Sequence, residues 1–149
     1  MEKGVVFDLD GTLIDVSERY NICKKKSKNN KEFWQCFLSM LYMYLDNPIE
    51  KMIEKVREYK RQGYLIIIIT GRVEETQKEA TLQQLQQFNI PYDLLFMRKL
   101  GDFRKDYEFK CSIIEKLLTG IKIEKIYDDS EEVRECVRKR FGIEALPPG

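Results

Sequence analysis

Histidine is absent from the 149 residues of the chain, and its four cysteines include no Cys-x-x-Cys pair. These absences exclude His-based catalytic triads and leave zinc sites and thioredoxin-like redox motifs without support. Neither sign of charge predominates, because 26 Lys and Arg residues face 25 Asp and Glu residues, and nothing marks the whole chain as a bulk binder of nucleic acid or membranes. We expect the cysteines to be reduced and to pack as small apolar side chains; they are Cys23, Cys36, Cys111 and Cys136.

Long apolar runs are absent as well. The longest aliphatic run, Leu65–Ile69, is far too short to cross a bilayer, and the N-terminus lacks the apolar stretch of a signal peptide. We therefore expect a cytoplasmic protein that has no membrane partner. The length of the chain and its 43% of hydrophobic residues suffice for one domain with a real core, spanning residues 1–149.

Short apolar runs alternate with longer amphipathic stretches along the chain. The runs predict strands at Val5–Leu9, Tyr64–Ile69, Leu94–Met97 and Ile123–Tyr127. The stretches predict helices from Pro48 to Gly63, Glu74 to Phe88, Tyr107 to Leu118 and Ser130 to Phe141, the last with Ser130 as its N-cap. This alternation is typical of an α/β fold, in which helices sandwich a Rossmann-like parallel sheet.

One segment, residues 15–47, does not fit the alternation, and we expect it to be a small helical cap inserted in the domain. Its basic run, Lys24–Lys28, is either a solvated loop or a contact for a sugar-phosphate backbone. The next residues predict a helix over Phe33–Leu45 that is apolar almost all round and so must be covered. Trp34 and Phe37 either pack in the cap or in a homodimer interface, or stack on bases.

Polar residues follow the predicted strands. They are Asp8 and Asp10; Thr70, Gly71 and Arg72; Asp106 and Lys110; and Asp128 and Asp129. Because the carboxyl ends of parallel strands meet at one edge of a sheet, we expect these groups to form one phosphoryl-transfer site. Asp8 suits the role of a nucleophile that forms an aspartyl-phosphate, and Asp10 suits that of the general acid/base.

Several carboxylates in one site would repel a phosphate dianion, since two unit charges about 4 Å apart interact by roughly 4 kcal/mol near a protein surface. A divalent cation is therefore expected, and ligands that are all oxygen favour Mg²⁺. Thr70 and Lys110 are expected to hold phosphate oxygens. The expected metal ligands are Asp8, Asp10, Asp128 and Asp129. The expected further substrate-binding residues are Gly71, Arg72, Arg104 and Asp106.

These motifs resemble those of the haloacid dehalogenase-like (HAD) phosphatases. Four motifs of that superfamily appear here in order, as Asp8-Leu9-Asp10-Gly11-Thr12, Thr70-Gly71-Arg72, Lys110, and Tyr127-Asp128-Asp129. By this resemblance the backbone carbonyl of Asp10 also binds Mg²⁺, and Thr70 and Lys110 bind the phosphate. Either Asp128 or Asp129 would complete the metal site. The resemblance also implies that residues 15–47 are the cap that selects the substrate.

A narrower resemblance lies in the segment Met97–Lys110, whose Gly-Asp-x-Arg-Lys-Asp-x-x-x-Lys string is similar to that of the 3′-phosphatase half of bacteriophage polynucleotide kinase-phosphatases. It implies that the substrate is a 3′-phosphate at a polynucleotide end. A kinase P-loop is absent, and Ser130 stands where that branch commonly has Arg. Two alternatives remain: a phosphatase of nucleotides or other small metabolites, and a non-catalytic binding module of the same fold.

Overall fold

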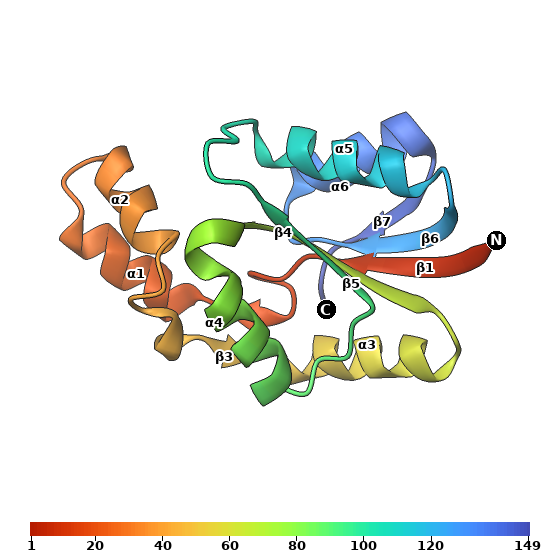
Figure 1. The fold of residues 1–149 in the computed structure, drawn as a ribbon, viewed down its shortest axis with the longest axis horizontal. Helices are drawn as coiled ribbons and strands as arrows, with labels where there is room; N and C mark the ends of the chain where they lie inside the picture. The colour runs from red at the N-terminus through yellow and green to blue at the C-terminus, as the bar shows by residue number, and fades with distance from the viewer.

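Five parallel strands form one sheet in the order β5-β4-β1-β6-β7 (Figure 1). The structure is a computed structural model that describes residues 1–149. The strands are β1 Glu2–Phe7, β4 Leu65–Val73, β5 Leu94–Arg98, β6 Ile121–Tyr127 and β7 Glu144–Leu146. The four predicted strands are present. The fifth, β7, escapes prediction because three residues are too few to show a hydrophobic pattern.

Helices cover both faces of this sheet (Figure 1). They are α3 Glu50–Arg61 and α4 Glu74–Gln87 on one face, and α5 Asp106–Leu117 and α6 Glu131–Phe141 on the other. Side chains that alternate along β1 divide the core in two: Val5 and Phe7 pack on the side of α3 and α4, and Val6 packs on the side of α5 and α6. The predicted α/β fold is confirmed. None of the helices is both long and apolar enough to span a bilayer.

The bounds of α6 follow from its local sequence. The Ser130 hydroxyl accepts a hydrogen bond from the backbone N–H of Val133 at 3.3 Å, which caps the first turn as predicted. Gly142 follows the last turn with a φ of +66°, a left-handed conformation that ends the helix. This cap fixes the chain that immediately precedes it, which carries Asp128 and Asp129.

The segment between β1 and α3 forms a helical unit beyond the carboxyl edge of the sheet (Figure 1). Its elements are β2 Ile14–Asp15, α1 Ser17–Lys26, α2 Asn30–Phe37, the 3₁₀ helix η1 Met43–Leu45, and β3 Asn47–Pro48, which pairs with β2. The prediction of a single helix over Phe33–Leu45 is wrong. The chain turns after Phe37, where Ser39 binds the Cys36 carbonyl through both its N–H and its hydroxyl.

The interpretation of Lys24–Lys28 as a solvated loop is wrong for its first three residues, because Lys24–Lys26 form the last turn of α1. Homodimer formation through α2 stays a prediction.

The four cysteines form two disulfides, so the expectation of reduced cysteines is wrong. The pairs are Cys23–Cys36 and Cys111–Cys136. The packing of α1 on α2 brings the first pair together, and the packing of α5 on α6 brings the second pair together. Because the partners lie on separate helices, 13 and 25 residues apart, their spacing carries no recognisable signal.

Candidate active site

Lys110 lies at the centre of the charged groups at the carboxyl edge of the sheet. Its Nζ donates to Asp8 Oδ1 at 2.9 Å and to Asp128 Oδ2 at 2.8 Å, and it lies 3.1 Å from Asp106 Oδ2. Burial lowers the pKa of Lys110, but Asp8, Asp128 and Asp106 outweigh burial and hold the pKa well above its ordinary value. The ammonium group therefore stays charged and joins three segments that are distant in the sequence.

Three carboxylates, those of Asp8, Asp128 and Asp129, each place an oxygen within 4.8 Å of the others. Burial, followed by the charge of Asp8, raises the pKa of Asp128 to about 7. Burial, followed by hydrogen bonding to Asp8, raises the pKa of Asp129 to about 8. Burial is the largest cause of both shifts, the neighbouring carboxylates add to it, and Lys110 opposes it only in part. A hard divalent cation would neutralise the negative charge that Lys110 leaves.

The two neighbouring aspartates after β6 differ in their environment. Asp128 is buried, and both of its oxygens are in use: Oδ2 accepts from Lys110, and Oδ1 accepts from the backbone N–H of Ser130 at 2.9 Å. Asp129 is the more exposed of the two, and its side chain is hydrogen-bonded to Asp8. Asp129 is therefore the more accessible of the two to a cation, whereas Asp128 orients Lys110.

Two glycines let the backbone approach these carboxylates. Gly11 has a φ of +85°, and a Cβ atom at this position would collide with the carboxylate of Asp129. A Cβ atom at Gly71 would lie 2.9 Å from Asp106 Oδ1. A larger side chain at either position would displace the acidic residue beside it.

Two buried arginines hold the carboxylate of Asp10. Arg72 donates to Oδ1 through Nη2 at 2.7 Å and through Nε at 3.0 Å, and Arg19 Nη2 lies 3.5 Å from Oδ2. Burial raises the pKa of Asp10, but Arg72 and then Arg19 outweigh burial, and the pKa lies below its ordinary value. The side chain of Asp10 is still 21% exposed, so the ionised carboxylate is accessible to water.

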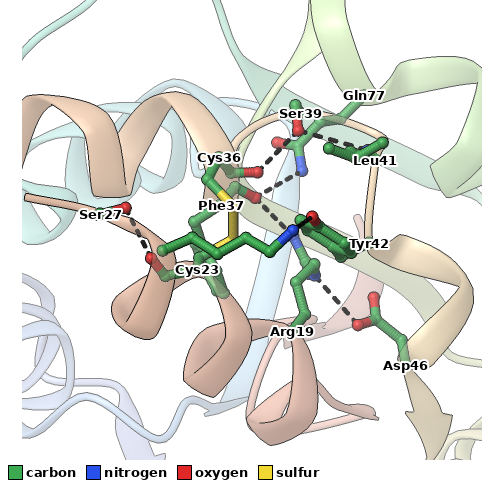
Figure 2. Close-up of a disulfide and its surroundings, with 11 residues drawn as sticks. Arg19, Cys23, Ser27, Cys36, Phe37, Ser39, Leu41, Tyr42, Asp46 and Gln77 are labelled. Atoms are coloured by element: carbon green, nitrogen blue, oxygen red, sulfur yellow. Dashed lines mark hydrogen bonds and ion pairs between the residues drawn. A yellow bond between two sulfur atoms is a disulfide. The ribbon is translucent and has the colours of Figure 1, made fainter.

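The buried carboxylate of Asp46 connects the two arginines. It accepts from Arg19 Nε at 3.0 Å and from Gln84 Nε2 at 3.1 Å, and it lies 3.4 Å from Arg72 Nη2. Arg19 also donates to the backbone carbonyl of Phe37 at 2.7 Å and lies over the Phe37 ring, 4.4 Å from its centre (Figure 2). The cap is thereby joined to the acid/base candidate.

Arg19 and Asp46 belong to no motif of the sequence, and sequence reasoning misses them. The one available signal is that Arg19 is the only arginine among the basic residues of the segment 15–47. Arginine, unlike lysine, suits a buried contact with several acceptors.

The structure places the remaining predicted site residues in two groups. Thr70 is buried and joins the site, because the pairing of Phe7 with Ile68 puts Thr70 at the same edge as the residue after β1. Arg104 does not join it. Its guanidinium binds Asp102 Oδ2 at 2.7 Å and Ser112 Oγ at 3.1 Å on the exposed rim.

The fold and the placement of these charged groups define the class of proteins to which this chain is similar. A haloacid dehalogenase-like family hydrolase from Streptococcus pneumoniae is 18% identical, with a TM-score of 0.68 over 98% of this chain and 84% of that chain. A class C acid phosphatase from Bacillus anthracis, solved with tungstate bound, is 17% identical, with a TM-score of 0.68 over 99% of this chain and 66% of that chain. The fold is that of the HAD-like hydrolases.

One family within the HAD-like hydrolases matches this chain. The family model described as the polynucleotide kinase PNKP phosphatase domain matches residues 2–147, so the chain belongs to this family and is a phosphatase. A chain in a structure of a Pnkp1/Rnl/Hen1 complex is 26% identical, with a TM-score of 0.76 over 100% of this chain and 47% of that chain. This protein therefore spans less than half the length of that relative. The resemblance to the HAD phosphatases and, more narrowly, to the phosphatase half of polynucleotide kinase-phosphatases is confirmed.

Proposed function

We propose that the protein is a Mg²⁺-dependent phosphomonoesterase that removes the 3′-phosphate from polynucleotide ends through an aspartyl-phosphate on Asp8. One observation carries the proposal: Lys110 contacts Asp8, Asp106 and Asp128 at distances of 2.8 to 3.1 Å. A cation fixed beside a buried carboxylate supplies both the charge and the position for attack on a phosphate. Membership of the PNKP phosphatase family supports the choice of substrate.

The proposed reaction has two steps. Asp8 attacks phosphorus, the bond to the 3′ oxygen breaks, and Asp10 in its acid form gives the leaving oxygen a proton. Water then attacks the phosphorus of the aspartyl-phosphate, the bond between phosphorus and the Asp8 oxygen breaks, and inorganic phosphate leaves. The Asp10 carboxylate takes a proton from the attacking water, so Asp8 returns to its carboxylate form and Asp10 to its acid form. The ionised form of Asp10 that Arg72 stabilises is the one that the second step requires.

Mg²⁺ would be held by the carboxylates of Asp8 and Asp129 and by the backbone carbonyl of Asp10. The fit rests on an all-oxygen donor set and on the clustering of the Asp8, Asp128 and Asp129 carboxylates, each of which places an oxygen within 4.8 Å of the others. When bound, Mg²⁺ supplies the positive charge that lets a phosphate dianion approach the carboxylates. Asp128 contributes by holding Lys110.

The proposed setting of the reaction is RNA repair. Two of the similar structures are of Pnkp1/Rnl/Hen1 complexes, and one of these is described as an RNA repair complex. On this basis we propose that 3′-phosphorylated RNA ends are among the substrates and that repair proteins are the partners. Small phosphate esters are the competing substrates, because the same charged groups would accept them.

A substrate panel tests the proposal. A 3′-phosphorylated oligonucleotide, its 5′-phosphorylated counterpart and nucleotide monophosphates are each incubated with enzyme and Mg²⁺, and released inorganic phosphate is measured. We expect kcat/KM to be at least about tenfold higher for the 3′-phosphorylated oligonucleotide. A higher kcat/KM for the small esters would refute the choice of substrate.

Two variants test the mechanism in the same assay. Asp8→Asn removes the nucleophile and is expected to abolish turnover, and Asp10→Asn is expected to lower kcat roughly 10²- to 10⁴-fold. Glu115→Gln makes the same chemical change at an exposed position of α5 and should leave kcat unaltered. Turnover by Asp8→Asn at the wild-type rate would refute the covalent mechanism.

A further inference from the structure

The cap has a concentration of positive charge that the proposed reaction does not use. Between residues 20 and 44 the chain has five lysines and one acidic residue, Glu32, although the net charge of the whole chain is +1. All five lysines are exposed and none forms an ion pair, and one of them, Lys26, donates a hydrogen bond from Nζ to the Tyr42 hydroxyl at 2.6 Å. The five are Lys24, Lys25, Lys26, Lys28 and Lys31.

Aromatic side chains lie among these lysines. The Nζ of Lys24 lies 5.8 Å from the centre of the Tyr20 ring. Trp34 on α2 packs edge to face against Phe33 and is nevertheless 52% exposed. Unpaired cations beside an exposed indole ring suit the phosphates and bases of a single strand, whose bases offer a free face for stacking. A duplex hides these faces.

The helix that carries most of these lysines begins at the active site. Arg19, in the first turn of α1, lies 3.5 Å from Asp10, and Lys24–Lys26 form the last turn of the same helix. At a rise of about 1.5 Å per residue, these lysines lie about 8 to 10 Å further along the helix axis. That distance is on the scale of a few nucleotides of a strand. Figure 1 shows α1 and α2 extending outward beyond the carboxyl edge of the sheet.

We infer that the outer surface of α1 and α2 binds the single-stranded nucleotides that precede the 3′-terminal phosphate. The lysines contact backbone phosphates, and Trp34 stacks on a base. The inference rests on the proposed function, because that function places the 3′ end at Asp8. The disulfide Cys23–Cys36 and the contact of Arg19 with Phe37 join the two helices, so this surface is formed before the strand arrives (Figure 2).

The dependence of KM on substrate length tests this inference. KM is measured for a nucleoside 3′-monophosphate and for 3′-phosphorylated oligonucleotides of about 2 to 12 nucleotides, and it is expected to fall with length. The triple variant Lys24→Gln, Lys25→Gln, Lys28→Gln should raise KM about tenfold for the longest oligonucleotide and leave KM for the monophosphate unchanged. The slope of log KM against log salt concentration should fall by about 2, since each phosphate contact on a single strand contributes about 0.7.

A matched variant controls for net charge. Lys51→Gln, Lys116→Gln, Lys122→Gln removes the same charge from three exposed lysines on α3, α5 and β6 that form no ion pair. Equal effects of the two triple variants would refute the inference, and so would a KM that does not depend on length. In both cases the release of 3′-phosphate continues, so the proposed function stands.

A second measurement does not require catalysis. Trp34 is the only tryptophan of the chain, so its fluorescence reports binding at α2. A single-stranded oligonucleotide with a 3′-hydroxyl should quench this fluorescence in the wild type and less in the lysine variant. No quenching, or equal quenching by a duplex, would refute the inference. Quenching without phosphate release from any 3′ end would support this surface and refute the proposed reaction alone.

Discussion

Asp46 is a buried carboxylate without a step of its own in the proposed reaction, and its neighbours explain its presence. Arg19 and Arg72 are fully buried and both face Asp10, so two guanidinium groups share one catalytic carboxylate. Asp46 supplies a second negative charge, which leaves this group of four side chains neutral. Burial raises the pKa of Asp46, while Arg19, a hydrogen bond from Gln84, and Arg72 oppose this shift.

The variant Asp46→Asn is expected to lower the free energy of unfolding by about 3 kcal/mol, because removing one partner of a buried ion pair leaves uncompensated charge. Urea denaturation followed by circular dichroism measures the change. Glu115→Gln is the matched control: its exposed ion pair with Arg140, at 2.8 Å, should contribute less than about 1 kcal/mol. Equal destabilisation by the two variants would contradict a role for Asp46 in neutralising the arginines.

The sequence predicts those helices and strands whose bounds are determined by a local pattern of residues. The predicted bounds of α3 to α6 lie within two residues of the observed ones, since apolar periodicity and caps fix them. The meeting of Asp8, Lys110 and Asp128 is also predictable, because β1 and β6 are parallel neighbours. The cap is different. Apolar residues continue past Phe37, yet α2 ends there, and periodicity carries no sign of the Ser39 turn.

Contacts between elements explain the rest of what sequence reasoning misses. The network of Arg19 and Asp46 depends on how the cap packs against α4, where Gln77 and Gln84 donate to cap carbonyls at 3.4 and 2.9 Å. Glutamines on a helix look like solvent-facing residues in a sequence, and only the packed structure reveals that these two are buried.

The disulfide between α1 and α2 yields a prediction for the cap. Cys23 and Cys36 close a loop of 13 residues, and the chain-entropy account assigns about 3 kcal/mol to a loop of this size. The variant Cys23→Ala, Cys36→Ala is therefore expected to lose about 2 to 4 kcal/mol of unfolding free energy in urea without reductant. Dithiothreitol should remove most of the difference, because it opens the same bridge in the wild type. Equal stability without reductant would show that helix packing alone holds the cap.

For the molecule as a whole, the acidic cluster links folding to pH. The carboxyl pKa values of Asp128 and Asp129 are raised to about 7 and about 8, whereas an unfolded chain has values near 4. Between about pH 4 and pH 8 the folded protein therefore binds protons that the unfolded chain has released. The free energy of unfolding of the metal-free protein falls as pH rises through this window.

Mg²⁺ should reverse this loss, and its effect should depend on pH. At about pH 5.5 the ion must displace protons from Asp128 and Asp129, whereas at about pH 8.5 it meets ionised carboxylates. A hundredfold excess over Kd at the higher pH adds about 2.7 kcal/mol, which corresponds to a rise in Tm of roughly 5 to 10 °C. Scanning calorimetry at both pH values measures the shift, and a chelator should reverse it. The variant Asp129→Asn should respond weakly at either pH. A shift that is equal at the two pH values, or undiminished in Asp129→Asn, would place the ion elsewhere on the protein.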